Sequence, residues 1–131
     1  MDRNAEGTNL SKPDSSNLER LVVEIQVAGQ EWIEAKLKSD QLDDGEKNYL
    51  AALMNSLDDA MKGTKISESK LERLARGSPE FGNYVIGKVT AIAETGRKKV
   101  RYEALQNLWE AKRSELSFER AKIEKGIFHH T

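Results

Sequence analysis

The residues that could carry out chemistry in this chain of 131 amino acids are few, and they do not form a catalytic set. The only histidines are His129 and His130. Adjacent residues on a helix point in different directions, and a chain end does not hold a fixed geometry. There is also no cysteine, so the usual nucleophile–base pairs cannot be assembled. We therefore predict that the protein is not an enzyme and that it has no cofactor.

Two acidic clusters are the only candidates for a metal site. The first contains Asp43, Asp44 and Glu46, and the second is the pair Asp58 and Asp59. Neither lies in an Asp-x-Asp-x-Asp-Gly loop, the arrangement that wraps acidic oxygens around a calcium ion. Asp43 followed three residues later by Glu46 matches a helix capping box, which is a sufficient role for both. We predict no metal site.

The most basic stretch of the sequence reads Arg97-Lys98-Lys99-Val100-Arg101, with four positive charges in five residues. Such a stretch can contact nucleic-acid phosphates, and the aromatic rings of Tyr102 and Trp109 could stack on bases. The alternative is a solvated helix flank, because glutamates interleave with the basic residues that follow. Tyr102 and Trp109 also fit an apolar helix face, so core packing is the alternative for both rings.

These residues must be positioned by helices, because the composition favours helix and the apolar residues recur every three or four positions. Capping residues and glycines predict one helical domain over residues 16–126 between a disordered tail, 1–15, and a short tail, 127–131. Ser67 and the Ser78-Pro79 pair are the clearest helix starts. The predicted helices cover residues 16–39, 43–62, 67–76 and 79–125, with Gly96 as the point at which the last would break.

The last helix is too long for a small fold. Its 47 residues would span roughly 70 Å at 1.5 Å per residue, whereas a compact chain of this length has a radius of gyration of about 14 Å. We therefore predict an all-α, coiled-coil-like hairpin or bundle that forms homo-oligomers. The apolar positions expected at the oligomer interface recur at coiled-coil spacing and are Tyr102, Leu105, Trp109, Leu116 and Ile123.

Small residues also recur along this helix, at Gly87, Ala91 and Thr95. Such spacing lets another helix approach closely, either within the chain or between two copies. The formal net charge of −1 also hides an acidic first half and a basic second half. These halves could attract each other in a hairpin, or leave positive charge for a partner.

No apolar run approaches the roughly 20 residues that span a bilayer, and the first residues contain no signal peptide. The lack of cysteine suits a reducing compartment. We expect a cytoplasmic protein without a membrane partner.

Residues 67–125 resemble small helical proteins encoded by bacteriophages near recombination and single-strand-annealing genes, and more distantly the UvsY type of phage recombination mediator. The similarity lies in a capped short helix and in a long helix with the motifs RKKVRYEAL and LWEAKRSE. It implies a homo-oligomeric accessory protein in the host cytoplasm that assists a recombinase or an annealing protein on single-stranded DNA. The DNA contacts that it implies are Arg97, Lys98, Lys99, Arg101 and Arg113.

A protein–protein role without nucleic acid is the alternative function. The near-neutral charge and the lack of catalytic residues also suit an adaptor, or a phage inhibitor that docks on a host enzyme or defence system. An oligomeric scaffold that holds a small nucleotide between subunits is a third hypothesis.

Overall fold

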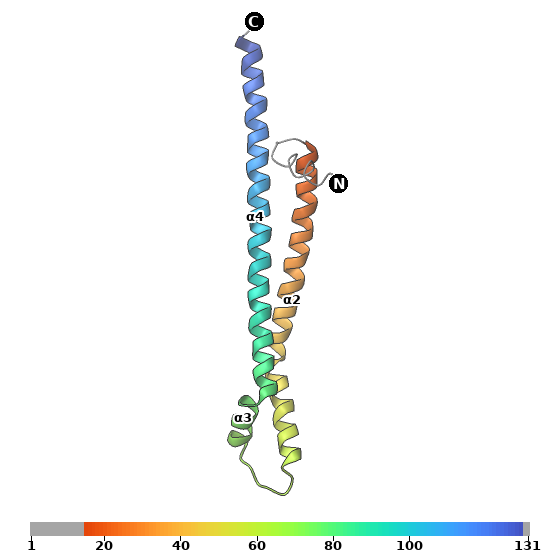
Figure 1. Ribbon diagram of the computed structural model, residues 1–131, viewed down its shortest axis with the longest axis vertical. Coiled ribbons are helices and arrows are strands. Elements are labelled where there is room, and N and C mark those ends of the chain that lie inside the picture. The colour runs from red at the N-terminus through yellow and green to blue at the C-terminus, as the bar shows by residue number, and fades with distance from the viewer. Residues whose placement is uncertain (1–14, 130–131) are drawn as a thin grey trace, which may run out of the picture. The chain divides into compact units, whose positions relative to one another are not determined.

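The computed structural model describes residues 15–129, with side chains from 17 to 125, and this part of the chain contains helices and no strand. Helix α2 covers Ser15–Ala60, α3 covers Glu68–Arg76 and α4 covers Pro79–His129 (Figure 1). The predicted all-α class with a long last helix is confirmed. The predicted tails at 1–14 and 130–131 lie outside the described residues.

Helix α2 is continuous, so the break predicted between residues 39 and 43 is wrong. Ser39 is buried at this point, and Lys36 pairs with Asp40 one turn later, at 3.0 Å. Asp43 does not cap a helix. Its carboxylate lies 2.9 Å from the Lys88 amino group on α4. Contacts with another helix therefore override the local capping pattern, as tertiary context commonly does.

The connections on either side of α3 follow the sequence signals closely. Gly63 adopts φ 91°, a left-handed conformation that favours glycine. The Ser67 side chain accepts a hydrogen bond from the Lys70 amide, and Gly77 caps the other end of α3. At the start of α4, the Ser78 hydroxyl accepts a hydrogen bond from the Phe81 amide at 3.2 Å. These short-range predictions are confirmed, because a cap needs only residues three or four positions apart.

Helix α4 passes through Gly96 without a break and continues past the predicted end at residue 125 to His129. An interior glycine costs about 1 kcal/mol relative to alanine, which is too little to interrupt a helix whose neighbouring turns are packed. Ala91 and Thr95, in the preceding turn, are shielded from solvent. The expected tail at 127–131 is therefore helical as far as His129.

The chain divides into two compact units, each of which combines parts of α2 and α4. The sequence had predicted one domain over residues 16–126. The described part of unit 1 is residues 15–32 with 98–129, and unit 2 is residues 33–97. Within each unit the two helices run antiparallel. In unit 2, for example, Asp43 of α2 contacts Lys88 of α4, whereas Tyr49, further along α2, contacts Tyr84, which comes earlier in α4.

Unit 2 contains the largest apolar cluster, at the junction of all three helices. Leu50 from α2, Ala75 from α3 and Phe81 from α4 are buried together. They are flanked by half-buried residues of α2, namely Tyr49, Leu53, Met54 and Leu57. Since α3 buries only Leu71 and Ala75, its stability comes from this packing and its caps rather than from its own nine residues.

Unit 1 is held by a close approach of its two helices. Leu21 and Ala28 are buried on α2. A Cβ atom built on Gly29 would lie 3.0 Å from Cε1 of Tyr102 on α4. The Tyr102 ring also packs on Trp32, with ring centroids 5.4 Å apart. Glycine at position 29 therefore gives the tyrosine ring its place against the α2 backbone.

Candidate interaction surface on helix α4

Helix α4 presents one stripe of residues to α2, spaced alternately three and four positions apart. In unit 2 this stripe contains Phe81, Tyr84, Lys88, Ala91 and Thr95, and in unit 1 it continues with Lys98, Tyr102, Leu105, Trp109, Lys112 and Leu116. All of these residues are buried or half-buried. The spacing is that of a coiled-coil seam, but three of its members are lysines.

Lys88 forms the main polar layer in unit 2. Its amino group lies 2.9 Å from an Asp43 oxygen and 3.0 Å from a Glu46 oxygen, and its side chain is 22% exposed. The hydrogen bonds that the Lys88 amino group donates to Asp43, and then to Glu46, raise the pKa of Lys88. A lysine held by two carboxylates fixes which turn of α4 meets which turn of α2, because sliding by one turn would leave a half-buried charge unpaired.

A tyrosine layer adjoins the lysine. The Tyr84 hydroxyl donates a hydrogen bond of 2.5 Å to the Leu42 carbonyl oxygen, one residue before Asp43. The Tyr84 ring stacks on Tyr49, with centroids 4.5 Å apart. Both rings therefore have a structural role in aligning the helices, and no buried side-chain polar atom lacks a partner in the described residues.

Most residues predicted to contact DNA have partners within the chain. Arg97 makes two hydrogen bonds with Glu94, at 2.9 and 3.1 Å, and Lys98 lies 3.8 Å from Glu31. Lys99 lies over the Trp32 ring at 6.0 Å, and Arg113 lies over Trp109 at 5.2 Å.

Arg101, the fifth residue of that set, is exposed on α4. DNA binding stays a prediction. Of the five residues, Lys98 is the one least accessible to a phosphate, at 30% side-chain exposure.

The opposite-signed halves of the sequence meet within each unit. Lys88 on α4 pairs with acids of α2 in unit 2, and Lys98 pairs with Glu31 in unit 1. Acidic α2 and basic α4 therefore attract each other along the hairpin, which is one of the two outcomes considered from the charge pattern.

The residues predicted at the oligomer interface divide between packed and exposed positions. Tyr102 packs on α2, and Leu105, Trp109 and Leu116 are half-buried. Ile123 is 61% exposed. Tyr102 thus has an intramolecular partner, while self-association through this stripe stays a prediction.

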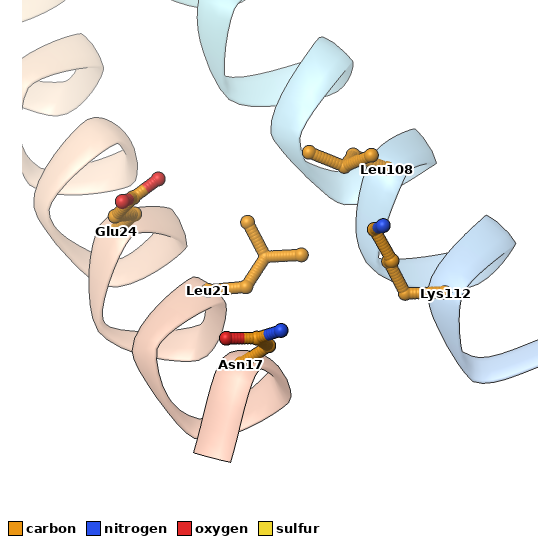
Figure 2. Close-up of a pocket in the computed structure, with 5 residues that line it drawn as sticks. All are labelled: Asn17, Leu21, Glu24, Leu108 and Lys112. Carbon is orange, nitrogen blue, oxygen red and sulfur yellow. The ribbon is translucent and has the colours of Figure 1, made fainter. Parts of the chain in front are cut away.

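The cavities between α2 and α4 within each unit range in volume from about 60 Å³ to about 460 Å³. Figure 2 shows one in unit 1, lined by Asn17, Leu21 and Glu24 of α2 and by Leu108 and Lys112 of α4. Its volume is about 60 Å³, well below the roughly 300 Å³ at which small-molecule pockets begin. Among the described residues, no group of acidic or histidine side chains is placed to hold a metal ion. Likewise, no described helix is long and apolar enough to cross a membrane.

The face of α4 directed away from α2 in unit 2 is uncharged and apolar. Exposed fractions here are 36% for Val85, 65% for Ile86, 58% for Val89 and 50% for Ile92. We call these four residues the outer face. Between residues 81 and 96 the only charged residues are Lys88 and Glu94. The first is turned towards α2 and the second is paired with Arg97.

Three glycines of α4 in unit 2 have open space where a side chain would begin. A Cβ atom built on Gly82, Gly87 or Gly96 would have no atom within 4 Å beyond its own local backbone. Gly29 and Gly45, in contrast, each have a tyrosine atom at 3.0 or 3.1 Å. Each interior glycine costs a helix about 1 kcal/mol relative to alanine. Gly87 lines a groove with Ala35 and Leu42 of α2.

The sequence contained a signal for the outer face that its helical periodicity alone did not reveal. In a chain with 33% charged residues, only two of the sixteen residues from 81 to 96 are charged. The small-residue series noted in the sequence divides here: Ala91 is buried against the chain itself, and Thr95 donates a hydrogen bond to the Ala91 carbonyl oxygen. Gly87 is the exposed member of the series.

No protein-family model, curated protein or solved structure matches this chain.

Proposed function

We propose that this protein is a non-enzymatic helical accessory protein that acts as a homo-oligomer, assembled through the outer face of α4. The observation that carries the proposal is the exposure of Val85, Ile86, Val89 and Ile92 on one uncharged helix face. Together they expose on the order of 400 Å² of apolar surface, the size of the largest apolar patch on a typical monomer, which is often a functional surface.

The rest of the site supports association rather than catalysis. The polar side chains of the α2–α4 seam are engaged in holding the two helices together, as Lys88 does with its two carboxylates. Action in the cytoplasm, as an accessory to a recombinase or annealing protein, belongs to the same proposal and rests on the cysteine-free composition and the phage resemblance.

The test is sedimentation equilibrium from low micromolar to several hundred micromolar protein. We expect the wild-type chain to self-associate with a concentration-dependent mass. Val89→Glu should weaken association at least tenfold, because burying an unpaired carboxylate in an apolar contact costs several kcal/mol and about 1.4 kcal/mol is a factor of ten.

Val23→Glu is the matched control, since Val23 lies on α2 of unit 1 and is exposed to 57%, against 58% for Val89. It should leave the association constant unchanged. Circular dichroism of both variants establishes that they remain helical. A wild-type chain that stays monomeric throughout, or equal weakening by both substitutions, would contradict the proposal and favour a host-protein partner.

A further inference from the structure

We infer that the outer face of α4 is covered by a second copy of the same helix, antiparallel to the first, with large side chains of one copy against small residues of the other. In this arrangement Ile86 packs on the partner's Gly96, and Val89 packs on the partner's Ala93. The inference rests on the proposed function and adds the identity and the orientation of the partner.

Two residues of the outer face, Ile86 and Val89, belong to a series with coiled-coil spacing, and Val85 and Ile92 flank this series. Residues 82, 86, 89, 93 and 96 are separated alternately by four and three positions, the spacing that keeps one side of a helix against another helix over several turns. All five residues are uncharged. Ile86, Val89, Ala93 and Gly96 are exposed and Gly82 is half-buried, so α4 carries one seam for its own chain and a second one that its own chain covers only at Gly82.

The order of large and small residues fixes the orientation. Ile86 and Gly96 stand five residues on either side of position 91, and Val89 and Ala93 stand two residues on either side. An antiparallel pair with its two-fold axis at this level therefore places each bulky side chain against a small one. A parallel pair places Gly96 against the partner's Gly96, which leaves that layer without side-chain packing.

The glycine at position 96 is the second line of support. Space for a Cβ atom is open there, so the α2–α4 packing does not require glycine. In the antiparallel pair, the partner's Ile86 fills this space. Small residues at helix contacts commonly let two backbones approach closely. Such a contact would explain why a glycine that destabilises the helix stands at position 96.

The flanks of the pair contain no like-charge contact. On one side Thr90 meets the partner's Thr90, and Arg97 meets the partner's Asn83. On the other side Ile92 meets the partner's Ile92 at the axis, which buries a side chain that is 50% exposed in one chain. The two-fold arrangement therefore adds apolar contact at its centre without repulsion at its ends.

The area predicts a weak dimer. Two outer faces of on the order of 400 Å² each, which already include the flanking Val85 and Ile92, supply about half of the roughly 1,600 Å² that standard interfaces bury. Such an interface corresponds to micromolar rather than nanomolar dissociation constants.

Disulfide trapping tests the orientation directly, because the chain has no cysteine of its own. We would prepare Ile86→Cys on a chain of normal length and Gly96→Cys on a chain with a mass tag. Each reduced variant alone and an equimolar mixture of the two reduced variants are then oxidised in parallel, and the disulfide-linked species are measured on non-reducing gels. The antiparallel pair predicts linked heterodimer from the mixture and little homodimer from either variant alone, because equal positions are ten residues or about 15 Å apart along the axis. A disulfide needs Cα atoms within about 7 Å.

Lys70→Cys on α3 is the control for random collision, and its linked fraction sets the background. If Ile86→Cys forms linked homodimer above this background and the mixture forms no linked heterodimer, the antiparallel orientation is wrong, although the chain still self-associates. A mixture at background level, from chains that still sediment as dimers under reducing conditions, would overturn the assignment of this face. A wild-type chain without dimers in sedimentation would instead reject the proposed function on which the inference rests.

Discussion

Glycine-to-alanine substitutions at three positions should have three different effects on stability. Gly87 lies inside α4, is exposed, and has no atom within 4 Å of a built Cβ. Alanine there gains helix propensity without a clash, which is worth about 1 kcal/mol. For a chain of this size, this gain should raise the melting temperature by roughly 3–6 °C.

Gly29 and Gly63 should not show this gain. A Cβ atom at Gly29 would lie 3.0 Å and 3.4 Å from two Tyr102 ring carbons, and that ring is also packed on Trp32. The propensity gain of Gly29→Ala should therefore be offset, and Gly29→Val should destabilise outright. Gly63 has φ 91°, so Gly63→Ala should cost roughly 1 kcal/mol.

Thermal and urea unfolding followed by circular dichroism at 222 nm measure all of these variants under one condition. Dilute protein keeps the monomer dominant, so that association does not contribute. A Gly29→Ala variant that gains as much stability as Gly87→Ala would refute the close packing of Tyr102 on α2. A loss of stability in Gly87→Ala would refute the open space at that position.

Three further predictions concern the core, the polar layer and the basic stretch. Phe81→Ala should cost about 3 kcal/mol in urea unfolding, because Phe81 is buried with Leu50 and Ala75, whereas Phe118→Ala, at a 68% exposed position, should cost little. Because the pKa of Lys88 is raised in the folded state, its charge stabilises the fold fully below the ordinary pKa of 10.5, and this stabilisation is lost as the pH rises through the higher pKa of the folded state. Lys88→Met should remove this loss of stability at alkaline pH, which urea unfolding at a series of pH values measures. A pH profile of stability that is the same in wild type and variant would contradict the role of Lys88. If single-stranded DNA binds, the double substitution Lys99→Ala with Arg101→Ala should weaken the binding of a labelled oligonucleotide. It should also reduce the slope of log K against log salt concentration by about 0.7 per lost phosphate contact, whereas Lys62→Ala should change neither. Equal weakening by both variants would show that the stretch from Arg97 to Arg101 is not the contact site.

Short-range signals in the sequence predicted the elements around α3 well. Ser67 and Ser78 cap the starts of α3 and α4 as expected, because each cap depends on residues within one helical turn. The prediction of a helix break after residue 39 was wrong, because it also used only a short-range pattern. A capping box at Asp43 is a local pattern, and the contact of Asp43 with Lys88 lies 45 positions away in the sequence.

The candidate site was harder to predict, because spacing cannot say which of two helix faces is covered. Tyr102 and Trp109 fit an apolar stripe, and the structure places that stripe against α2. Lys98 belongs to the most basic stretch of the sequence, yet its partner is Glu31. The outer face at Val85, Ile86, Val89 and Ile92 became visible only when the inner stripe had been assigned.

The sequence by itself therefore determined that the chain is helical, where α3 and α4 begin, and that a long last helix carries more apolar positions than one partner helix covers. These properties follow from caps, periodicity and composition, which act over a few residues. The tertiary structure decided the continuity of α2, the pairing of Lys88 with Asp43 and Glu46, and the face of α4 that remains uncovered. Those properties depend on the rotation and register of α4 against α2, which contacts between distant residues set.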